Sequence, residues 1–334
     1  MSKNKVVIAT RGSKLALWQA NWVKAQLEKR NPGLTIDLKK IKTTGDKILD
    51  VPLAKVGGKG LFVKEIEDAL LRKEADLAVH SMKDVPTDLP KGLYIAVILK
   101  REDPRDAFIT KISNSIPNKS GQISNFKSLP KGASVGTSSL RRMCQLLSIR
   151  PDLKIAQLRG NLDTRIRKLE GGQFDAIIVA AAGVKRLGMA EKITEILEPD
   201  ISLPAIAQGA VGIECRTDDK FINELIAPLN HEKTSICVRA ERAFLKKLEG
   251  GCQVPIAAHA RLVESQGSKS DASRITHHEL LFMEGLVGSV SGDRIIKDSI
   301  QGKPEDAEKL GLKLAEELIS KGAGKILAEV YSRE

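Results

Sequence analysis

Short apolar runs alternate with longer amphipathic stretches along the first part of the chain. Each run is bounded by glycine, proline or polar residues and is typical of a buried strand, whereas the stretches between them have helical spacing. Strands that alternate with helices predict βαβ units and a mainly parallel sheet. The strands predicted for this first α/β unit are 5–10, 34–41, 75–80 and 92–99.

The first predicted helix begins near Lys14. Ser13 is placed to cap it, because a serine oxygen can accept a hydrogen bond from a backbone amide of the first turn. The helix has an apolar stripe with helical spacing. Its members are Leu15, Trp18, Trp22 and Ala25.

The pattern of strands and helices restarts after a polar segment, 111–131, which is rich in Ser, Asn, Pro and Gly and is predicted to be a mobile loop. This restart predicts a second α/β unit, followed by an isolated strand and helix within 209–230. The C-terminal part differs and predicts a small α+β domain. It contains a helix at about 232–248, strand candidates at 255–263, 279–290 and 294–300, and a final amphipathic helix from Pro304.

The charge of the chain points to an anionic partner, since 54 Lys and Arg against 42 Asp and Glu give a net charge of +12. Aromatic residues make up only 3%, too few for a base-stacking platform. The basic residues fall singly beside glycines and at the ends of elements. This distribution favours pockets for small polyanions over a groove for nucleic acid.

The location expected from the sequence is the cytoplasm. No apolar run approaches the roughly 18 residues of a membrane span, and the N-terminus passes directly into a strand without the apolar region of a signal peptide. The four cysteines form no CxxC pair, which argues against a disulfide framework and a zinc site. We expect neither a metal nor a membrane partner.

A first candidate for chemistry is the stretch VHSMKDVP, 79–86, where a predicted strand ends and Lys83 and Asp84 follow in a turn. Ligands of parallel α/β sheets bind at the carboxyl ends of strands, so a catalytic carboxylate is well placed here. Spacing alone favours the alternative, an ordinary surface turn with a solvated Lys–Asp pair.

Three strand-to-helix junctions, at 11–17, 135–145 and 158–169, carry arginine beside glycine or serine. Free amides at a helix N-terminus, together with hydroxyl and guanidinium groups, can bind anions, and three such junctions favour a clustered anion pocket. Arginine pairs with carboxylates through two parallel hydrogen bonds but serves phosphates equally, so both ligands remain open.

A lone thiol, Cys252, follows two glycines in LEGGCQVP, and no local partner supports a protease-like nucleophile. The histidines lack the spacing of metal or catalytic motifs and are expected to be structural or solvated. They are His80, His231, His259, His277 and His278.

Eight motifs cover nearly the whole chain: ATRGSKLALWQA, PLAKVGGKGLFVKEIEDALL, ADLAVHSMKDVPT, KREDPRDAF, VGTSSLRRMCQL, LRGNLDTRIRKL, ISLPAIAQGAVGIECR and LEGGCQVPIAAHA. In this order they resemble the porphobilinogen deaminase (hydroxymethylbilane synthase) family. The resemblance implies two α/β lobes, like those of periplasmic binding proteins, around a cleft, and a C-terminal α+β domain. The implied first lobe is 1–100 with 209–230, the second is 101–208, and the C-terminal domain, with the cofactor cysteine, is 231–334.

The resemblance also implies a transferase of tetrapyrrole (heme) biosynthesis. Such an enzyme joins four porphobilinogen molecules head to tail, releases ammonia each time, and yields hydroxymethylbilane after hydrolysis. Cys252 would carry the dipyrromethane cofactor through a thioether bond. Asp84 matches the catalytic aspartate, whose carboxylate can stabilise the cationic methylene-pyrrolenine and move protons.

Each porphobilinogen brings an acetate and a propionate, and the resemblance assigns basic and hydroxyl side chains to these carboxylates. Cofactor binding would fall to Lys83, Ser13, Thr137, Ser139, Arg141, Arg142 and Arg159, and substrate binding to Arg11, Arg165, Arg186, Lys55, Lys59 and Phe62. Arg101 and Arg105 are further candidates at the cleft edge. Core packing is an equal alternative for Phe62.

The chain departs from the family pattern in two long polar segments, 111–131 and 264–278, which interrupt no motif. A competing hypothesis is a non-catalytic two-lobed protein that binds anions or solutes, which would need no anchored thiol. We expect the enzyme, as a monomer.

Overall fold

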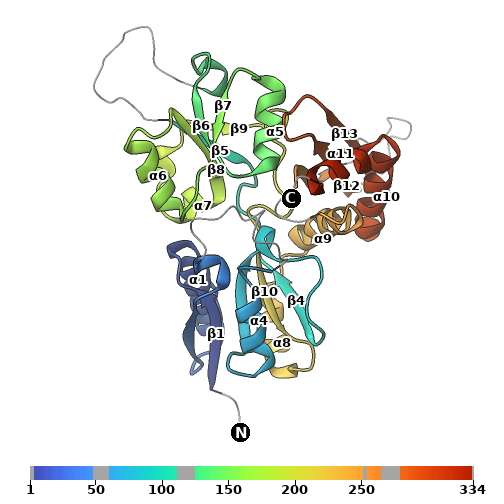
Figure 1. The fold of residues 1–334 in the computed structure, drawn as a ribbon. Helices are drawn as coiled ribbons and strands as arrows, with labels where there is room; N and C mark the ends of the chain where they lie inside the picture. Colours follow the sequence, from blue (N-terminus) through green and yellow to red (C-terminus); the bar gives the residue numbers. More distant parts are fainter. Residues whose placement is uncertain (1–3, 48–59, 111–124, 251–253, 265–278, 333–334) are drawn as a thin grey trace, which may run out of the picture.

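The computed structural model describes residues 4–47, 60–110, 125–250, 254–264 and 279–332. Within these ranges the strands form three sheets, and Figure 1 shows them as three separate bodies. Two are α/β lobes, one above the other in this view, and the third lies beside them. The prediction of two α/β lobes and a C-terminal α+β domain is confirmed.

The sheet of the first lobe has the order β2-β1-β3-β10-β4. β1, β2 and β3 run parallel, and β10 is antiparallel to both of its neighbours, so the sheet is mainly parallel as predicted. Its strands are β1 (Lys5–Arg11), β2 (Thr35–Ile41), β3 (Leu77–Ser81), β4 (Leu93–Ile98) and β10 (Val211–Arg216), and its helices α1 (Lys14–Arg30), α2 (Thr44–Lys47), α4 (Lys64–Leu71) and α8 (Lys220–Ile226).

The sheet of the second lobe repeats this plan in the order β7-β6-β8-β5-β9, with β5 antiparallel to its neighbours. The chain therefore exchanges one antiparallel strand between the lobes: β5 follows β4 into the second, and β10 returns to the first. The elements are β5 (Asp106–Thr110), β6 (Ser134–Gly136), β7 (Lys154–Ala156), β8 (Ala176–Ala180), β9 (Glu195–Leu197), α5 (Leu140–Ile149), α6 (Leu162–Glu170) and α7 (Ala181–Arg186).

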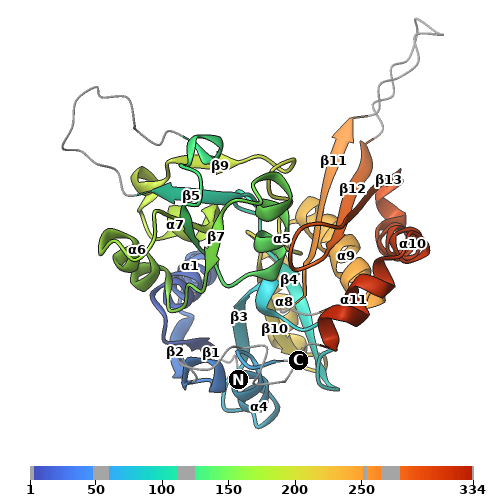
Figure 2. The same ribbon diagram turned by 45° about the horizontal axis from the view of Figure 1, so that its top comes forward.

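The C-terminal domain is an antiparallel sheet, β11-β12-β13, with helices packed against one face (Figure 2). The final helix predicted from Pro304 is in fact two helices. Gly322, at φ +100°, separates them in a left-handed conformation that glycine adopts without strain. The elements are α9 (Glu232–Lys247), β11 (Ile256–Glu264), β12 (Glu279–Gly288), β13 (Ile295–Gly302), α10 (Ala307–Ser320) and α11 (Ala323–Tyr331).

Single turns of 3-10 helix connect several of these elements. The described ones are η1 (Met82–Asp84), η2 (Phe126–Ser128), η3 (Ala190–Lys192), η4 (Ala227–Leu229) and η5 (Pro304–Asp306). Most of the predicted loop 111–131 lies outside the described residues, and η2 occupies its described end. In the described part of the chain, none of the helices combines the length and apolar character needed to cross a bilayer.

The first helix confirms its predicted cap but not the burial that its apolar stripe suggests. Ser13 Oγ accepts a hydrogen bond from the amide of Ala16 at 3.3 Å. Trp18 and Trp22 are each 39% exposed, whereas the buried face of α1 consists of Gln19, Ala20, Val23 and Leu27. This second stripe has smaller side chains, which let α1 approach the sheet closely.

The C-terminal domain packs against both lobes. One apolar core joins Met82, Val85 and Ile98 of the first lobe to Val238 and Phe244 of α9. The core shared with the second lobe is smaller and contains Cys144, Leu203, Ala257 and Leu286. The C-terminal domain thus contacts the first lobe through α9 and the second lobe through its sheet, against which α5 lies.

The two segments that link the lobes run side by side. The amide of Leu99 donates to the carbonyl of Val211 at 2.9 Å, and that of Glu102 to Gly209 at 3.2 Å. Gly209 has φ +86°, and a Cβ there would lie 2.4 Å from the carbonyl oxygen of Glu102. Only glycine permits this close approach.

Candidate functional site

The turn at the end of β3 carries Lys83 and Asp84 and is anchored from within. The side chain of Met82 is buried, and its amide donates to the carbonyl of Ala210 at 3.0 Å. A Cβ at Gly212 would lie 2.1 Å from Met82 Sδ, so the neighbouring strand makes room for this anchor. Lys83 and Asp84 themselves are half-buried.

Positively and negatively charged side chains both act on Lys83. Burial lowers its pKa to about 8, and the positive charges of Arg142 and Arg141 act in the same direction, against the carboxylate of Asp84. A lysine with such a pKa loses part of its charge near neutral pH, and an added anion would restore it.

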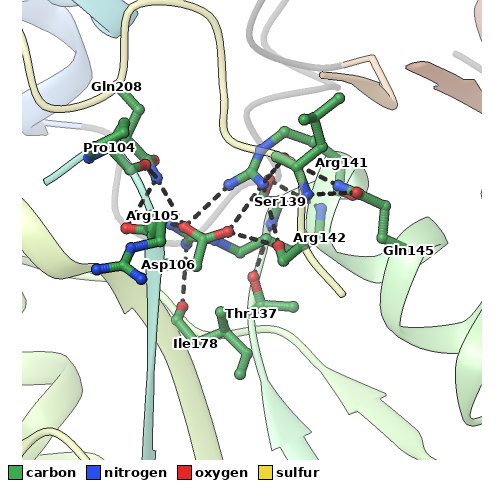
Figure 3. Close-up of polar contacts among 12 residues, drawn as sticks. Pro104, Arg105, Asp106, Thr137, Ser139, Arg141, Arg142, Gln145, Ile178 and Gln208 are labelled. Atoms are coloured by element: carbon green, nitrogen blue, oxygen red, sulfur yellow. Dashed lines mark hydrogen bonds and ion pairs between the residues drawn. The ribbon is translucent and has the colours of Figure 1, made fainter. Parts of the chain in front are cut away.

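Behind these groups, Asp106 at the start of β5 is fully buried and collects hydrogen bonds from four side chains (Figure 3). Arg141 donates from Nη1 and Nη2 at 2.9 and 3.2 Å, and Arg142 from Nη2 and Nε at 2.7 and 3.1 Å. Ser202 Oγ and Gln208 Nε2 add contacts of 2.8 and 2.9 Å. Burial alone would raise the pKa of Asp106, but the two guanidinium groups outweigh it and hold that pKa far below its usual range.

The start of α5 sets the direction of the two arginines. Ser139 caps the helix by accepting from the amide of Arg142 at 3.4 Å, and Thr137 Oγ1 accepts from the amide of Ser139 at 3.2 Å. Arg141 and Arg142 are only 4% and 5% exposed, and they also donate to the carbonyls of Leu203 and Ile178. They are therefore held rigidly on Asp106.

A third arginine reaches the same field from α6. Arg165 Nε donates to the carbonyl of Gly160 at 2.8 Å. Burial and the charges of Arg142 and Arg159 together lower its pKa to about 10, while Asp84 of the other lobe opposes them. Lys83, Asp84, Arg142, Arg159 and Arg165 thus interact across the lobes, and we call them the interlobe cluster.

Other predicted residues lie in two separate places. Arg186 on α7 donates to the carbonyl of Gly209 at 2.7 Å and lies 5.8 Å from the ring centre of Trp18, and burial lowers its pKa. Arg11 stacks on Phe62 at 4.3 Å and bonds to Asp46. In the part of the chain that the structure describes, no hydrogen bond or ion pair joins Arg11 to the interlobe cluster.

Arg101 and Arg105, weaker sequence candidates, are engaged in ion pairs. Arg101 binds the buried carboxylate of Glu241 through contacts of 2.6 and 3.1 Å, linking the segment between β4 and β5 to α9. Arg105 pairs with Asp103 and Glu198. These ion pairs indicate a structural role for both guanidinium groups.

Cys252, Lys55 and Lys59 lie outside the described residues. The three described cysteines, Cys144, Cys215 and Cys237, are buried, and burial raises the pKa of each thiol to about 12. They are therefore protonated and shielded at neutral pH. Among the residues described, no group of His, Cys, Asp and Glu side chains is arranged to hold a metal ion.

Sequence reasoning missed Asp106, Ser202 and Gln208. Asp106 stands inside the quoted motif KREDPRDAF, but the candidates predicted in that motif were its arginines. The available signal was a carboxylate at the start of an apolar strand, because an Asp is almost never buried without a partner.

Comparison with known proteins identifies the family. Residues 6–224 match the family model described as porphobilinogen deaminase, dipyromethane cofactor binding domain, and residues 235–320 match its C-terminal domain. The porphobilinogen deaminase of Geobacter sulfurreducens is 56% identical over 334 residues, covering 100% of this chain and 97% of the relative. That of Pelobacter propionicus is 52% identical and covers 100% of both.

Solved structures align more distantly. A probable amino-acid ABC transporter extracellular-binding protein from Bacillus subtilis has a TM-score of 0.38 and 13% identity, over 67% of this chain and 89% of that one. An ancestral arginine-binding protein has a TM-score of 0.37 and 16% identity, over 69% and 92%. The family assignment rests on the sequence relatives instead. Since one family model spans most of the chain and full-length relatives exceed half identity, the chain belongs to the porphobilinogen deaminase family.

Proposed function

We propose that this protein joins four porphobilinogen molecules head to tail, releasing ammonia at each step and, after hydrolysis, hydroxymethylbilane. Membership of the porphobilinogen deaminase family carries the assignment of a tetrapyrrole-forming transferase. The observation that carries the residue assignment is the interlobe cluster, where one carboxylate, Asp84, stands among cationic side chains of both lobes.

The dipyrromethane cofactor of this family, when bound, is the primer on which the substrate units are joined. The described residues fit such a group, because the charges that act on Lys83 and Arg165 include more cations than carboxylates. Burial lowers the pKa of both side chains, so a bound carboxylate would stabilise their charged forms.

Asp84 is the proposed catalytic residue. Among the described residues, no hydrogen bond occupies its carboxylate. It can therefore face the positive charge that develops as ammonia leaves, and it can accept and return a proton at the reacting ring. Lys83, its neighbour in the turn, interacts electrostatically with that carboxylate.

We assign the binding roles of the arginines according to how exposed their side chains are. Arg159 and Arg165 are half-buried and are proposed to contact carboxylates directly, with Lys83. Arg141 and Arg142, fixed on Asp106, supply positive potential and the remaining N–H groups. Ser13, Thr137 and Ser139 shape the helix starts, and Arg11, Arg186 and Phe62, with Lys55 and Lys59, are assigned to later substrate units.

Cys252 is the proposed attachment site of the cofactor. The support from the structure is indirect: the three other cysteines are shielded, and their pKa values of about 12 leave no thiolate near neutral pH. Cys252 follows Gly250 and Gly251, and glycine lets a loop adopt backbone angles that other residues avoid.

The test of Cys252 is the intact mass of the purified protein, wild type beside Cys252→Ser. An excess equal to two linked pyrrole units in the wild type, absent from the variant, is expected. If both proteins instead have the masses calculated from their unmodified sequences, before and after incubation with porphobilinogen, the cysteine carries nothing.

The test of Asp84 is Asp84→Asn, with Asp88→Asn in the same loop as the matched control. We expect Asp84→Asn to keep the cofactor mass but to lower kcat about 100-fold or more, the usual contribution of a positioned acid–base group. The control should stay within about twofold of wild type, because Asp88 is exposed and its contacts with Lys246 and Thr87 lie at the surface. An Asp84→Asn enzyme with wild-type kcat would remove the assignment.

We further propose that the domains are 1–100 with 209–230, 101–208 and 231–334, a division supported by the three sheets. A monomer in the cytoplasm is proposed from the sequence. The alternative of a non-catalytic solute-binding protein is not favoured, because the relatives that match over full length are porphobilinogen deaminases.

A further inference from the structure

The turn that carries Asp84 is held from outside its own lobe. Arg242, on α9, donates from Nη1 to the carbonyl of Val85 at 3.0 Å and from Nη2 to that of Pro86 at 2.5 Å. These two carbonyls follow Asp84 directly in the chain. A planar guanidinium group can bind both at once, so it fixes the direction of the chain as well as its distance.

Packing in the core shared with α9 holds Met82 and Val85 of this turn. A cavity of about 230 Å³ lies beside it, lined by Met82, Leu89, Ile98 and Arg242 among others. Pro86 is half-buried and is not among the residues of the shared core. The two hydrogen bonds of Arg242 therefore fix the chain at the point where the apolar packing ends.

The charge around Arg242 suits this role. Burial lowers its pKa, while Asp88 and Glu214 favour its charged form. Hydrogen bonds from a charged donor to carbonyl oxygens are about twice as strong as neutral ones. On the same helix, Lys246 forms an ion pair of 2.7 Å with Asp88, but both side chains are 61% exposed. This second contact therefore adds little.

Helix α9 ends at Lys247, shortly before Cys252. The helix that precedes the cysteine loop in the chain is thus the one that hydrogen-bonds to the turn carrying Asp84. We propose that Arg242 is a positioning residue, which couples the C-terminal domain to the Asp84 turn and sets the position of that carboxylate. This inference rests on the proposed role of Asp84.

The test compares Arg242→Gln and Arg242→Lys with Lys246→Gln, in cofactor-loaded protein. Arg242→Gln should lower kcat about tenfold, since small displacements of a reacting group are costly, and leave KM for porphobilinogen within about twofold. Arg242→Lys, which keeps the charge and one of the two contacts, should recover part of kcat. Lys246→Gln should behave as wild type.

A second measurement is independent of activity. Hydrogen exchange of the amides in 82–90 should become faster in Arg242→Gln, while exchange in the second lobe stays unchanged. Unchanged exchange in 82–90 would overturn the inference, and so would faster exchange with wild-type kcat. If Arg242→Gln does not fold, Arg242→Lys decides by the same two readouts. Failure of the proposed function is seen separately, as an active Asp84→Asn enzyme.

Discussion

Each lobe has a buried carboxylate at the corresponding position of its sheet, but the two carboxylates differ in their hydrogen-bond partners. In each sheet the antiparallel strand stands fourth in the order, β10 in the first lobe and β5 in the second. β10 carries Glu214 and β5 carries Asp106, both fully buried. A shared architecture thus places a negative charge at comparable positions, and the difference lies in its partners.

Asp106 is fully satisfied, with four donor side chains that include two guanidinium groups. Glu214 has one side-chain partner among the residues described, His80 at 2.9 Å, and its other oxygen has none there. Glu67 on α4 stands nearby, and one of its oxygens also lacks a partner in the described structure. Burial, and then the charge of Glu214, raises the pKa of Glu67 to about 7.

The second lobe therefore has a carboxylate whose pKa lies far below its usual range, so Arg141 and Arg142 keep their counter-charge near neutral pH. In the first lobe Glu67, which interacts with Glu214, exchanges a proton near neutral pH. We therefore expect the stability of the second lobe to depend on the charge of Asp106, and the stability of the first lobe to depend on pH.

The largest effect is expected from Asp106→Asn, which removes that charge. The substitution leaves Arg141 and Arg142 buried without a counter-charge, and breaking such a pair costs about 3–5 kcal/mol. Urea unfolding should show this loss of unfolding free energy, together with a lower yield of cofactor-loaded protein. Glu170→Gln, which removes the exposed Lys192–Glu170 pair, is the control and should cost less than about 1 kcal/mol. Equal losses in the two variants would contradict this role of Asp106.

Glu67→Gln is expected to have a smaller effect, confined to pH dependence. The folded-state pKa of Glu67 is raised from 4.5 to about 7, so folding favours its protonated form. The resulting stabilisation is fully present below about pH 4.5 and is lost as pH rises to about 7. Glutamine cannot titrate, and the loss of unfolding free energy between pH 5 and pH 8 should shrink, on the order of 2 kcal/mol.

Urea unfolding at several pH values measures this change. The matched control is Glu224→Gln, since Glu224 is a 69% exposed glutamate of the same lobe and should leave the pH dependence as it is. A Glu67→Gln protein with the wild-type pH profile would show that Glu67 does not exchange its proton in this range.

The alternation of strands and helices was sufficient to predict both lobes and the third domain, because local periodicity determines these elements. It could not show that β5 and β10 are antiparallel, which depends on how the chain passes between the lobes. For α1, two apolar stripes compete on one helix, and only the sheet decides which is buried.

The same distinction applies to the site: the residues of its motifs could be predicted from the sequence, but their partners could not. Lys83, Asp84 and the arginines of α5 and α6 stand in motifs that the sequence displays. Their partners are distant in the chain: Asp106 precedes Arg141 by 35 residues, and His80 meets Glu214 across 134. Contacts of this kind follow from tertiary packing, so neither Asp106 nor Arg242 was predicted.

The smallest effect is expected from Ser202→Ala, which removes one of the four donors to Asp106. Two guanidinium groups and Gln208 remain, so the carboxylate stays paired, and the lost neutral hydrogen bond should cost about 1 kcal/mol. Because the pKa of Asp106 lies far below its usual range, this cost should be the same at pH 6 and pH 8, in contrast to the effect of Glu67→Gln. Ser148→Ala, at an exposed serine of α5, is the control, with almost no change by urea unfolding. A Ser202→Ala cost that grows with pH would mean that Asp106 is a titrating carboxylate after all, and the contrast between the lobes would disappear.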